Sequence, residues 1–186
     1  IMELSKENNI NVVHNTTQGL LADAMAKDLP EVESAVPVMN LSSAGMTFNV
    51  KTKDKTLKAA GIFAGKNFFN IFSFNLLHGV PQQVLAARNG IVISESLATS
   101  LFGSVANAAG KTVEWEVVGA PKRQAPIAGI FKELPANNSM KFDFVLSYDM
   151  LINEIWIDEQ SWNNEGAQAY LALKAGTDLK NYNKKI

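Results

Sequence analysis

Alternating and helical hydrophobic patterns divide the first part of the chain into short elements. Residues 10–14 alternate as a strand does, and the apolar stripe that follows recurs at helical spacing. This stripe predicts a helix that Thr16 or Thr17 caps and that Pro30 stops. The apolar segment around Pro37 predicts a strand, and the proline favours the edge of a sheet because it cannot donate a ladder hydrogen bond.

The middle of the chain combines a hairpin, a cluster of phenylalanines and a strand that leads into a helix. Residues 46–63 alternate on both sides of a polar turn, which predicts the hairpin. Residues 67–74 are rich in phenylalanine, and one helical turn would bring two of these rings onto one face. An apolar strand over residues 91–93 precedes a short helix, for which Ser94 or Ser96 is a favoured cap.

The rest of the chain adds more strands and a final helix. Residues 111–118 and 127–131 are predicted strands, and the alternating segment that follows them places Asp143 on a solvent face. A strand over residues 169–173 precedes a helix that residues 176–178 open. The order of these elements predicts an α+β or α/β protein.

Composition and charge exclude several classes of protein. The 186 residues suit one domain, or one domain with two lobes. The net charge of −1 lacks the basic footprint of a general nucleic-acid binder, so no nucleic-acid partner is expected. The chain has no cysteine and two histidines, which excludes thiol chemistry and disulfides and favours no metal and no cofactor.

The apolar runs and the first residues of the chain bear on whether it spans a membrane and whether it is part of a longer protein. No run of about 18 apolar residues is present, so the sequence predicts no membrane span. The chain begins with Ile1 before Met2, from which we expect a piece of a longer protein.

Few residues suggest catalysis. Ser94 lies where a strand meets a helix, as the nucleophile of a hydrolase would, but the glycines of a nucleophile elbow are missing. A helix cap is the favoured interpretation of Ser94, and a serine hydrolase is the alternative. His14 and His78 are far apart and have no carboxylate motif around them, so we expect structural or solvated histidines and no enzyme activity.

Two other features suggest contacts with partners or membranes. Trp156 and Trp162 flank a polar stretch, and both are candidates for a partner interface because tryptophan is enriched at interfaces. The tail from Lys174 onwards is rich in lysine. Either a solvated helix end or a segment near a membrane surface would explain that pattern.

Several segments, in order and spacing, resemble the periplasmic core domain of MacB-type, FtsX-like ABC transporter permeases, in the form found in Bacteroidetes-type bacteria. The resemblance extends over most of the chain and rests on residues 29–33 (LPEVE), 65–79 (GKNFFNIFSFNLLHG), 91–103 (IVISESLATSLFG), 109–113 (AGKTV) and 128–139 (AGIFKELPANNS).

The resemblance implies a two-lobed α+β domain. A porter-like βαβ lobe would comprise residues 1–60 and 141–186, and residues 61–140 would form an inserted mixed α/β lobe. Loop residues at the crossings between lobes can absorb a hinge motion. The hinge candidates are Ala60, Gly61, Asn138 and Ser139.

The resemblance also implies a function without catalysis, and we carry over no functional residue from the family. A periplasmic domain of an inner-membrane permease would couple ATP-driven motion in the cytoplasm to export, or to the handling of a lipoprotein or other partner. The implied partners are the permease's membrane helices, its ATPase, a periplasmic adaptor or lipoprotein, and a second copy of the domain. The alternative is a stand-alone periplasmic module that binds a ligand in a cleft between its lobes.

Overall fold

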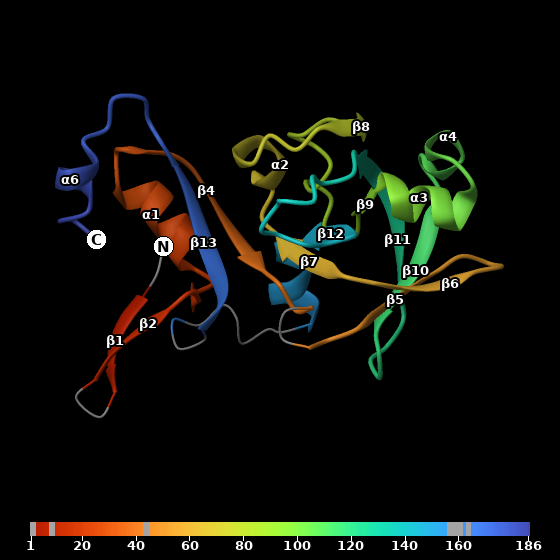
Figure 1. Cartoon of the computed structure of the whole chain (residues 1–186), viewed down its shortest axis with the longest axis horizontal. Helices are drawn as coiled ribbons and strands as arrows, with labels where there is room; N and C mark the ends of the chain where they lie inside the picture. The colour runs from red at the N-terminus through yellow and green to blue at the C-terminus, as the bar shows by residue number, and fades with distance from the viewer. Residues whose placement is uncertain (1–2, 8–9, 43–44, 156–161, 163–164) are drawn as a thin grey trace.

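A mixed sheet with short helices along it makes up this α+β protein (Figure 1). The computed structural model describes residues 3–7, 10–42, 45–155, 162 and 165–186. The elements in chain order are β1 (Glu3–Glu7), β2 (Ile10–His14), β3 (Thr17–Gln18), α1 (Leu21–Asp28), β4 (Val32–Met39), β5 (Phe48–Lys51), β6 (Thr56–Ala59), β7 (Gly61–Ala64), α2 (Phe68–Ile71), β8 (Leu76–His78), β9 (Ile91–Ser94), α3 (Glu95–Phe102), α4 (Val105–Ala108), β10 (Thr112–Val117), β11 (Arg123–Phe131), β12 (Phe144–Ser147), α5 (Tyr148–Met150), the π-helix η1 (Leu151–Ile155), β13 (Glu165–Leu173) and α6 (Leu179–Tyr182).

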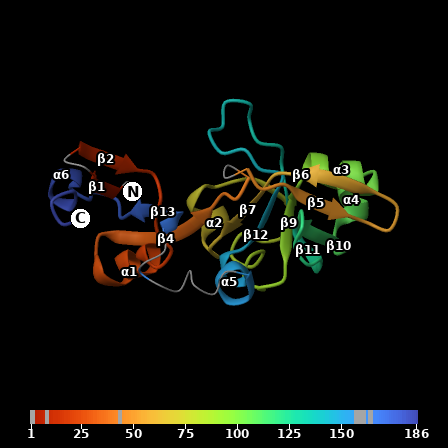
Figure 2. The same ribbon diagram turned by 90° about the horizontal axis from the view of Figure 1, so that it is seen from below.

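The sheet runs along the whole length of the molecule. Its strand order is β3-β13-β4-β7-β12-β9-β11-β10-β5-β6, with β8 paired to β11. The pairs β7–β12 and β9–β11 are parallel. Among the described strands, β1 and β2 form a separate two-stranded sheet. It lies at the same end as α6 in both views, whereas β5 and β6 lie at the opposite end (Figures 1 and 2).

Buried side chains form three clusters along the sheet. The largest surrounds Trp115 and Phe48 between the sheet and α3, and a second surrounds Phe68 and Phe69 of α2. The third is small and belongs to the end of the molecule that carries α1 and α6. Its buried members are Ala22, Met25, Val32, Ala35, Ala169 and Tyr182.

Several local predictions are confirmed. The hydroxyl of Ser94 caps α3 by accepting a hydrogen bond from Leu97 N, and Gly103 ends that helix with a left-handed φ of 83°. Phe68 and Phe72 lie on one face of α2, with ring centroids 5.0 Å apart. The final helix, α6, begins where the sequence predicts, with Asp178 as its cap.

Pro37 was expected at a sheet edge, and this prediction is wrong. Pro37 lies inside the sheet, because β4 pairs with β13 on one side and with β7 on the other. Gly65 N donates to Pro37 O at 3.0 Å, so the proline nitrogen faces the β7 side, where the ladder stops after Val38. The missing N–H is therefore tolerated at the end of a ladder.

The prediction of a solvent face on the strand near Asp143 is also wrong. In β12, Val145 and Ser147 are as buried as their neighbours, because the strand lies in the middle of the sheet with packed groups on both faces. Asp143 itself is partly buried, and its carboxylate accepts a hydrogen bond from Ala60 N. The predicted cap of α1 differs too: Thr17 lies in β3, and Leu20 precedes the helix.

Candidate functional site

Ser94 has the environment of a helix cap and lacks that of a nucleophile. Its side chain is 1% exposed, and its hydroxyl lies 3.1 Å from both Leu97 N and Ser96 Oγ. His78 lies in β8, which is separated from β9 by β11, so the two backbones are about two strand spacings, roughly 10 Å, apart. The side chain of His14 lies outside the described part of the structure. These positions give Ser94 no base from His78 and no access to a substrate.

The described residues form neither a cluster of metal ligands nor a membrane-spanning helix. Within the described ranges, no group of three or more histidine, cysteine, aspartate or glutamate side chains could hold a metal ion. Nor does any helix in those ranges have the length and apolar character needed to cross a membrane.

Of the two tryptophans predicted to contact a partner, one can be placed. Trp162 is 54% exposed, which makes it one of the most exposed large apolar side chains of the described chain. Trp156 lies outside the described residues. Their role at an interface stays a prediction.

The crossing at the hinge candidates Ala60 and Gly61 is held by polar contacts from two other segments. Ala60 N donates to Asp143 Oδ2 at 2.7 Å, and Ala60 O accepts from Asp143 N at 2.7 Å. Gly61 N donates to Ser42 Oγ at 2.9 Å. A side chain at position 61 would collide with the ring of Phe144, which lies 2.2 Å from the place of a Cβ. We call this set of contacts the Ala60 crossing.

The other pair of hinge candidates, Asn138 and Ser139, lies in the loop between β11 and β12. Asn138 N donates to Pro135 O at 2.9 Å, and Asn138 Oδ1 accepts from Met140 N at 2.9 Å. Ser139 is exposed. The hydrogen bonds at this loop are therefore local, whereas those at the Ala60 crossing join distant segments.

A cleft of about 160 Å³ lies between α1 and the rest of the molecule. One wall is the start of α1, the opposite wall is formed by α5, η1 and the turn after β7, and β4 lies between them. Charged side chains come from both walls: Asp23 from the first, and Lys66 and Asp149 from the second. The remaining lining residues are Gly19, Leu20, Ala35, Pro37, Gly65, Asn67, Tyr148 and Ile152.

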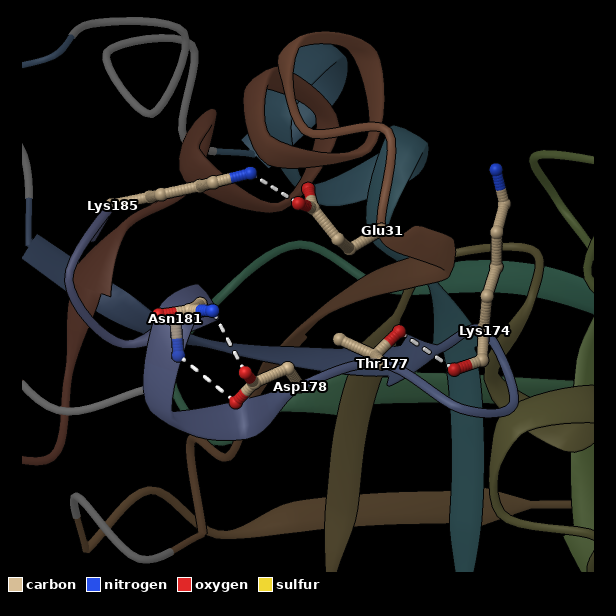
Figure 3. A network of polar contacts seen from close by, with 6 residues as sticks. All are labelled: Glu31, Lys174, Thr177, Asp178, Asn181 and Lys185. Carbon is tan, nitrogen blue, oxygen red and sulfur yellow. Dashed lines mark hydrogen bonds and ion pairs between the residues drawn. The ribbon is translucent and has the colours of Figure 1, made fainter.

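The end of the chain is fastened to the corner between α1 and β4 (Figure 3). Lys185 forms an ion pair with Glu31, and Glu31 O accepts a hydrogen bond from Lys174 N at 2.9 Å. The Lys185 ammonium holds the pKa of Glu31 below its ordinary value of 4.5. Asp178 caps α6, which places Tyr182 in the small core cluster, where burial and then the charge of Glu31 raise the pKa of its hydroxyl.

Comparison with known proteins identifies the family. A model of the MacB-like periplasmic core domain matches residues 2–186. The chain belongs to this family. It is therefore the periplasmic part of an ABC transporter permease, and the resemblance noted in its motifs is confirmed. A search of curated protein sequences finds no match.

Solved structures of MacB-like and related domains share the fold. A domain of a permease protein from Porphyromonas gingivalis has a TM-score of 0.76 and 24% identity, covering 94% of this chain and 76% of that one. The periplasmic region of MacB from Actinobacillus actinomycetemcomitans gives 0.64 and 16%, covering 88% and 68%. The extracellular domain of the ABC-type transporter YknZ from Gram-positive bacteria gives 0.62 and 12%, covering 90% and 78%.

Sequence reasoning missed the two features that organise this MacB-like domain, the Ala60 crossing and the cleft beside α1. The crossing had a signal, since Asp143 stands between two phenylalanines that are both buried. A carboxylate among buried rings needs a hydrogen-bond donor, and the donor is a backbone N–H that no motif reveals. The cleft had no signal, because its walls come from segments far apart in the sequence.

Proposed function

We propose that this domain transmits motion between the ATPase of a MacB-like transporter and a partner in the periplasm, without catalysing a reaction itself. Membership of the family supports the setting. The Ser94 hydroxyl, engaged as a cap in a buried position, supports a role without hydrolysis. Partners under this proposal are the membrane helices and ATPase of the transporter, a periplasmic adaptor or lipoprotein, and a second copy of the domain.

The division into lobes is part of this proposal. Residues 61–140 would form an inserted lobe beside residues 1–60 and 141–186. Strands on both sides of the first boundary share one sheet, since β5 of the first segment pairs with β10 of the inserted one. The contacts at the Ala60 crossing make Asn138 and Ser139 the freer of the two hinge pairs.

The ligand-binding alternative has less support. The cleft beside α1 measures about 160 Å³, whereas sites for small ligands commonly measure about 300–1,000 Å³. Two other hollows, of about 310 and 400 Å³, are shallow and open to solvent. A thermal-shift screen with metabolites and peptides would show a raised Tm if this alternative were right.

Spin labels on the complete transporter test the proposed function. This chain contributes no cysteine, so a Val118→Cys substitution gives one label per copy on an exposed tip once cysteines in the other parts of the transporter are replaced. We expect the distance between the labels of two copies to change when the reconstituted transporter is trapped with ATP or with ADP and vanadate.

A transporter whose ATPase cannot hydrolyse ATP is the matched control, and it should hold one distance under turnover conditions. Identical distance distributions in all nucleotide states would contradict the transmission of motion by this domain. A stable transporter that gives no distance at all would contradict the pairing of two copies.

The partner contact at Trp162 needs its own test. A photo-cross-linking amino acid at position 162 of the complete permease should form an adduct with a periplasmic protein in living cells. The same group at position 118, which is equally exposed, should give a weaker adduct or none. Equal adducts at both positions would remove Trp162 from the proposed interface.

A further inference from the structure

The end of the molecule that carries both chain-terminal elements has a core of its own. We define the terminal unit as α1, α6, and the paired halves of β4 and β13 over residues 32–35 and 171–173. The small core cluster holds it together, and its members include Met25 of α1, Val32 of β4 and Tyr182 of α6. The other half of β4 belongs elsewhere, since Val36 and Val38 pack in the cluster around Phe68. Each half of the strand is thus buried in a different core.

The connection between the terminal unit and the rest, which we call the body, is narrow. β4 pairs with β13 over six residue pairs but with β7 over two, Val38↔Ala64 and Met39↔Phe63. At the next position Pro37 has no N–H to donate, and its carbonyl accepts one hydrogen bond, from Gly65 N at 3.0 Å. In both views β4 runs from the end that carries α1 towards the body, and β13 is paired along its outer side (Figures 1 and 2). A two-stranded ribbon therefore carries the terminal unit.

The space beside this ribbon allows movement. The cleft of about 160 Å³ separates the start of α1, including Asp23, from Asp149 of α5 in the body. One aromatic contact braces the other part of the ribbon: the ring of Tyr170 in β13 lies edge-on to Phe72 of the body, with centroids 5.0 Å apart. The ribbon therefore faces a gap beside α1, and its contacts with the body are mainly apolar, from Val36, Val38 and Tyr170. Apolar packing without a long ladder permits a rocking motion.

We propose that the terminal unit rocks on the β4–β13 ribbon near Pro37, so that the cleft between α1 and α5 opens and closes. This inference deepens the proposed function and rests on it for its purpose. Both β1 and α6 lie at the terminal end, so a force applied through either end of the chain reaches the terminal unit first. The stiffness of the joint would then determine how much of the resulting movement of the terminal unit is transmitted to the body.

Pairs of spin labels on the 186-residue chain test the joint directly. The pair Lys27→Cys and Ser100→Cys spans it, since these exposed residues lie in α1 and α3. Two control pairs lie within one part each: Asn70→Cys with Ser100→Cys in the body, and Lys27→Cys with Lys180→Cys in the terminal unit. We expect the distance distribution of the spanning pair to be at least about twofold broader than those of the controls.

A variant of the brace adds a second readout. Tyr170→Leu should broaden the distribution of the spanning pair further and leave both control pairs unchanged. Phe131→Leu is the control, because the ring of Phe131 belongs to the same cluster and contacts the rings of Phe69 and Phe142, which lie in the body and take no part in the brace. Equal widths for all three pairs, whether narrow or broad, would overturn the joint.

The two proposals fail separately. The label pairs on this chain involve no nucleotide and no transporter, so a broad spanning pair supports the joint even if Val118 labels in the complete transporter do not respond to ATP. A narrow distance distribution for the spanning pair overturns the joint. The nucleotide-dependent motion of the whole domain is then still tested by the Val118 labels in the complete transporter.

Discussion

Two places where the sheet connects neighbouring parts of the molecule differ in how they are held. At the Ala60 crossing, Asp143 and Ser42 bind the backbone of Ala60 and Gly61 from two directions. Near Pro37, by contrast, the ladder to the body is short: two residue pairs and the hydrogen bond from Gly65 N to Pro37 O. Apolar packing supplies the rest, with Val36 and Val38 in the Phe68 cluster and the ring of Tyr170 against Phe72. The number of strands in a sheet thus says little about its stiffness. Stiffness depends on how many residue pairs each ladder contains and on how side chains pack or bond between neighbouring strands.

The largest expected effect is at the Ala60 crossing. Gly61→Ala would place a Cβ 2.2 Å from Phe144 Cζ, and the fully buried Phe144 ring is held edge-on against Phe48. We expect a loss of about 3 kcal/mol in the free energy of unfolding, measured by urea denaturation.

Gly119→Ala is the matched control for this substitution. Gly119 has a φ of +92° and nothing within 4 Å of a Cβ, so its cost comes from backbone strain, about 1 kcal/mol. If the two variants lost equal unfolding free energy, the structure around Phe144 would accommodate the added methyl group. The Ala60 crossing would then be no more rigid than the joint.

A smaller effect is expected for Asp143→Ala. It leaves Ala60 N without its acceptor in a partly buried position, which costs about 2 kcal/mol of unfolding free energy. Asp143→Asn keeps an acceptor oxygen and should cost less than half as much. If the two variants were equally stable in urea, the carboxylate would not be what fastens the crossing.

The contrast also shows which parts of this fold the sequence can predict. Ser94 and Asp178 were predictable as caps, since a cap is a local hydrogen bond between residues two or three apart. The prediction for Pro37 was wrong because a proline needs only the absence of a hydrogen-bond acceptor facing its nitrogen. An edge strand meets this need, and so does a position beyond the end of a neighbouring strand. The sequence does not reveal where β7 ends. The family was recognisable because the order of its motifs and the spacing between them can be read directly along the sequence.

The candidate site was less predictable than the fold. Ala60 and Asp143 are 83 residues apart, and their bond joins a backbone N–H to a side chain, so no pairing of residue types reveals it. The cleft depends on the angle at which α1 packs on β4. That angle follows from the sizes of Ala22, Met25 and Ala35 in three dimensions, which a periodic pattern does not contain.

The ring contact at the joint should be worth less than either change at the crossing. A double-mutant cycle with Phe72→Leu and Tyr170→Leu should give a coupling of about 1 kcal/mol, as edge-on aromatic pairs do. Tyr170→Phe is the control for the hydroxyl, which bonds Gln168 Oε1 at 2.8 Å. Zero coupling would mean that the rings touch without bracing the ribbon, and that the joint is freer than proposed.

The smallest effect concerns the ion pair inside the terminal unit. Lys185→Gln removes the main cause of the lowered pKa of Glu31. A carboxylate with a depressed folded-state pKa stabilises the protein above its ordinary pKa, and this stabilisation is lost as the pH falls through the lowered value. The two proteins should therefore differ slightly in Tm at neutral pH, and the difference should shrink as the pH falls below 4.5.

The same variant separates the stiffness of the terminal unit from that of its joint. Lys185 and Glu31 both belong to the end of the molecule beyond Pro37, so their pairing fastens α6 without crossing the ribbon. The distance distribution of the spanning pair should consequently be unchanged by Lys185→Gln, whereas that of the Lys27 and Lys180 pair should broaden. A broader spanning pair with an unchanged terminal pair would show that the ion pair acts at the joint, and would contradict its assignment to the terminal unit alone.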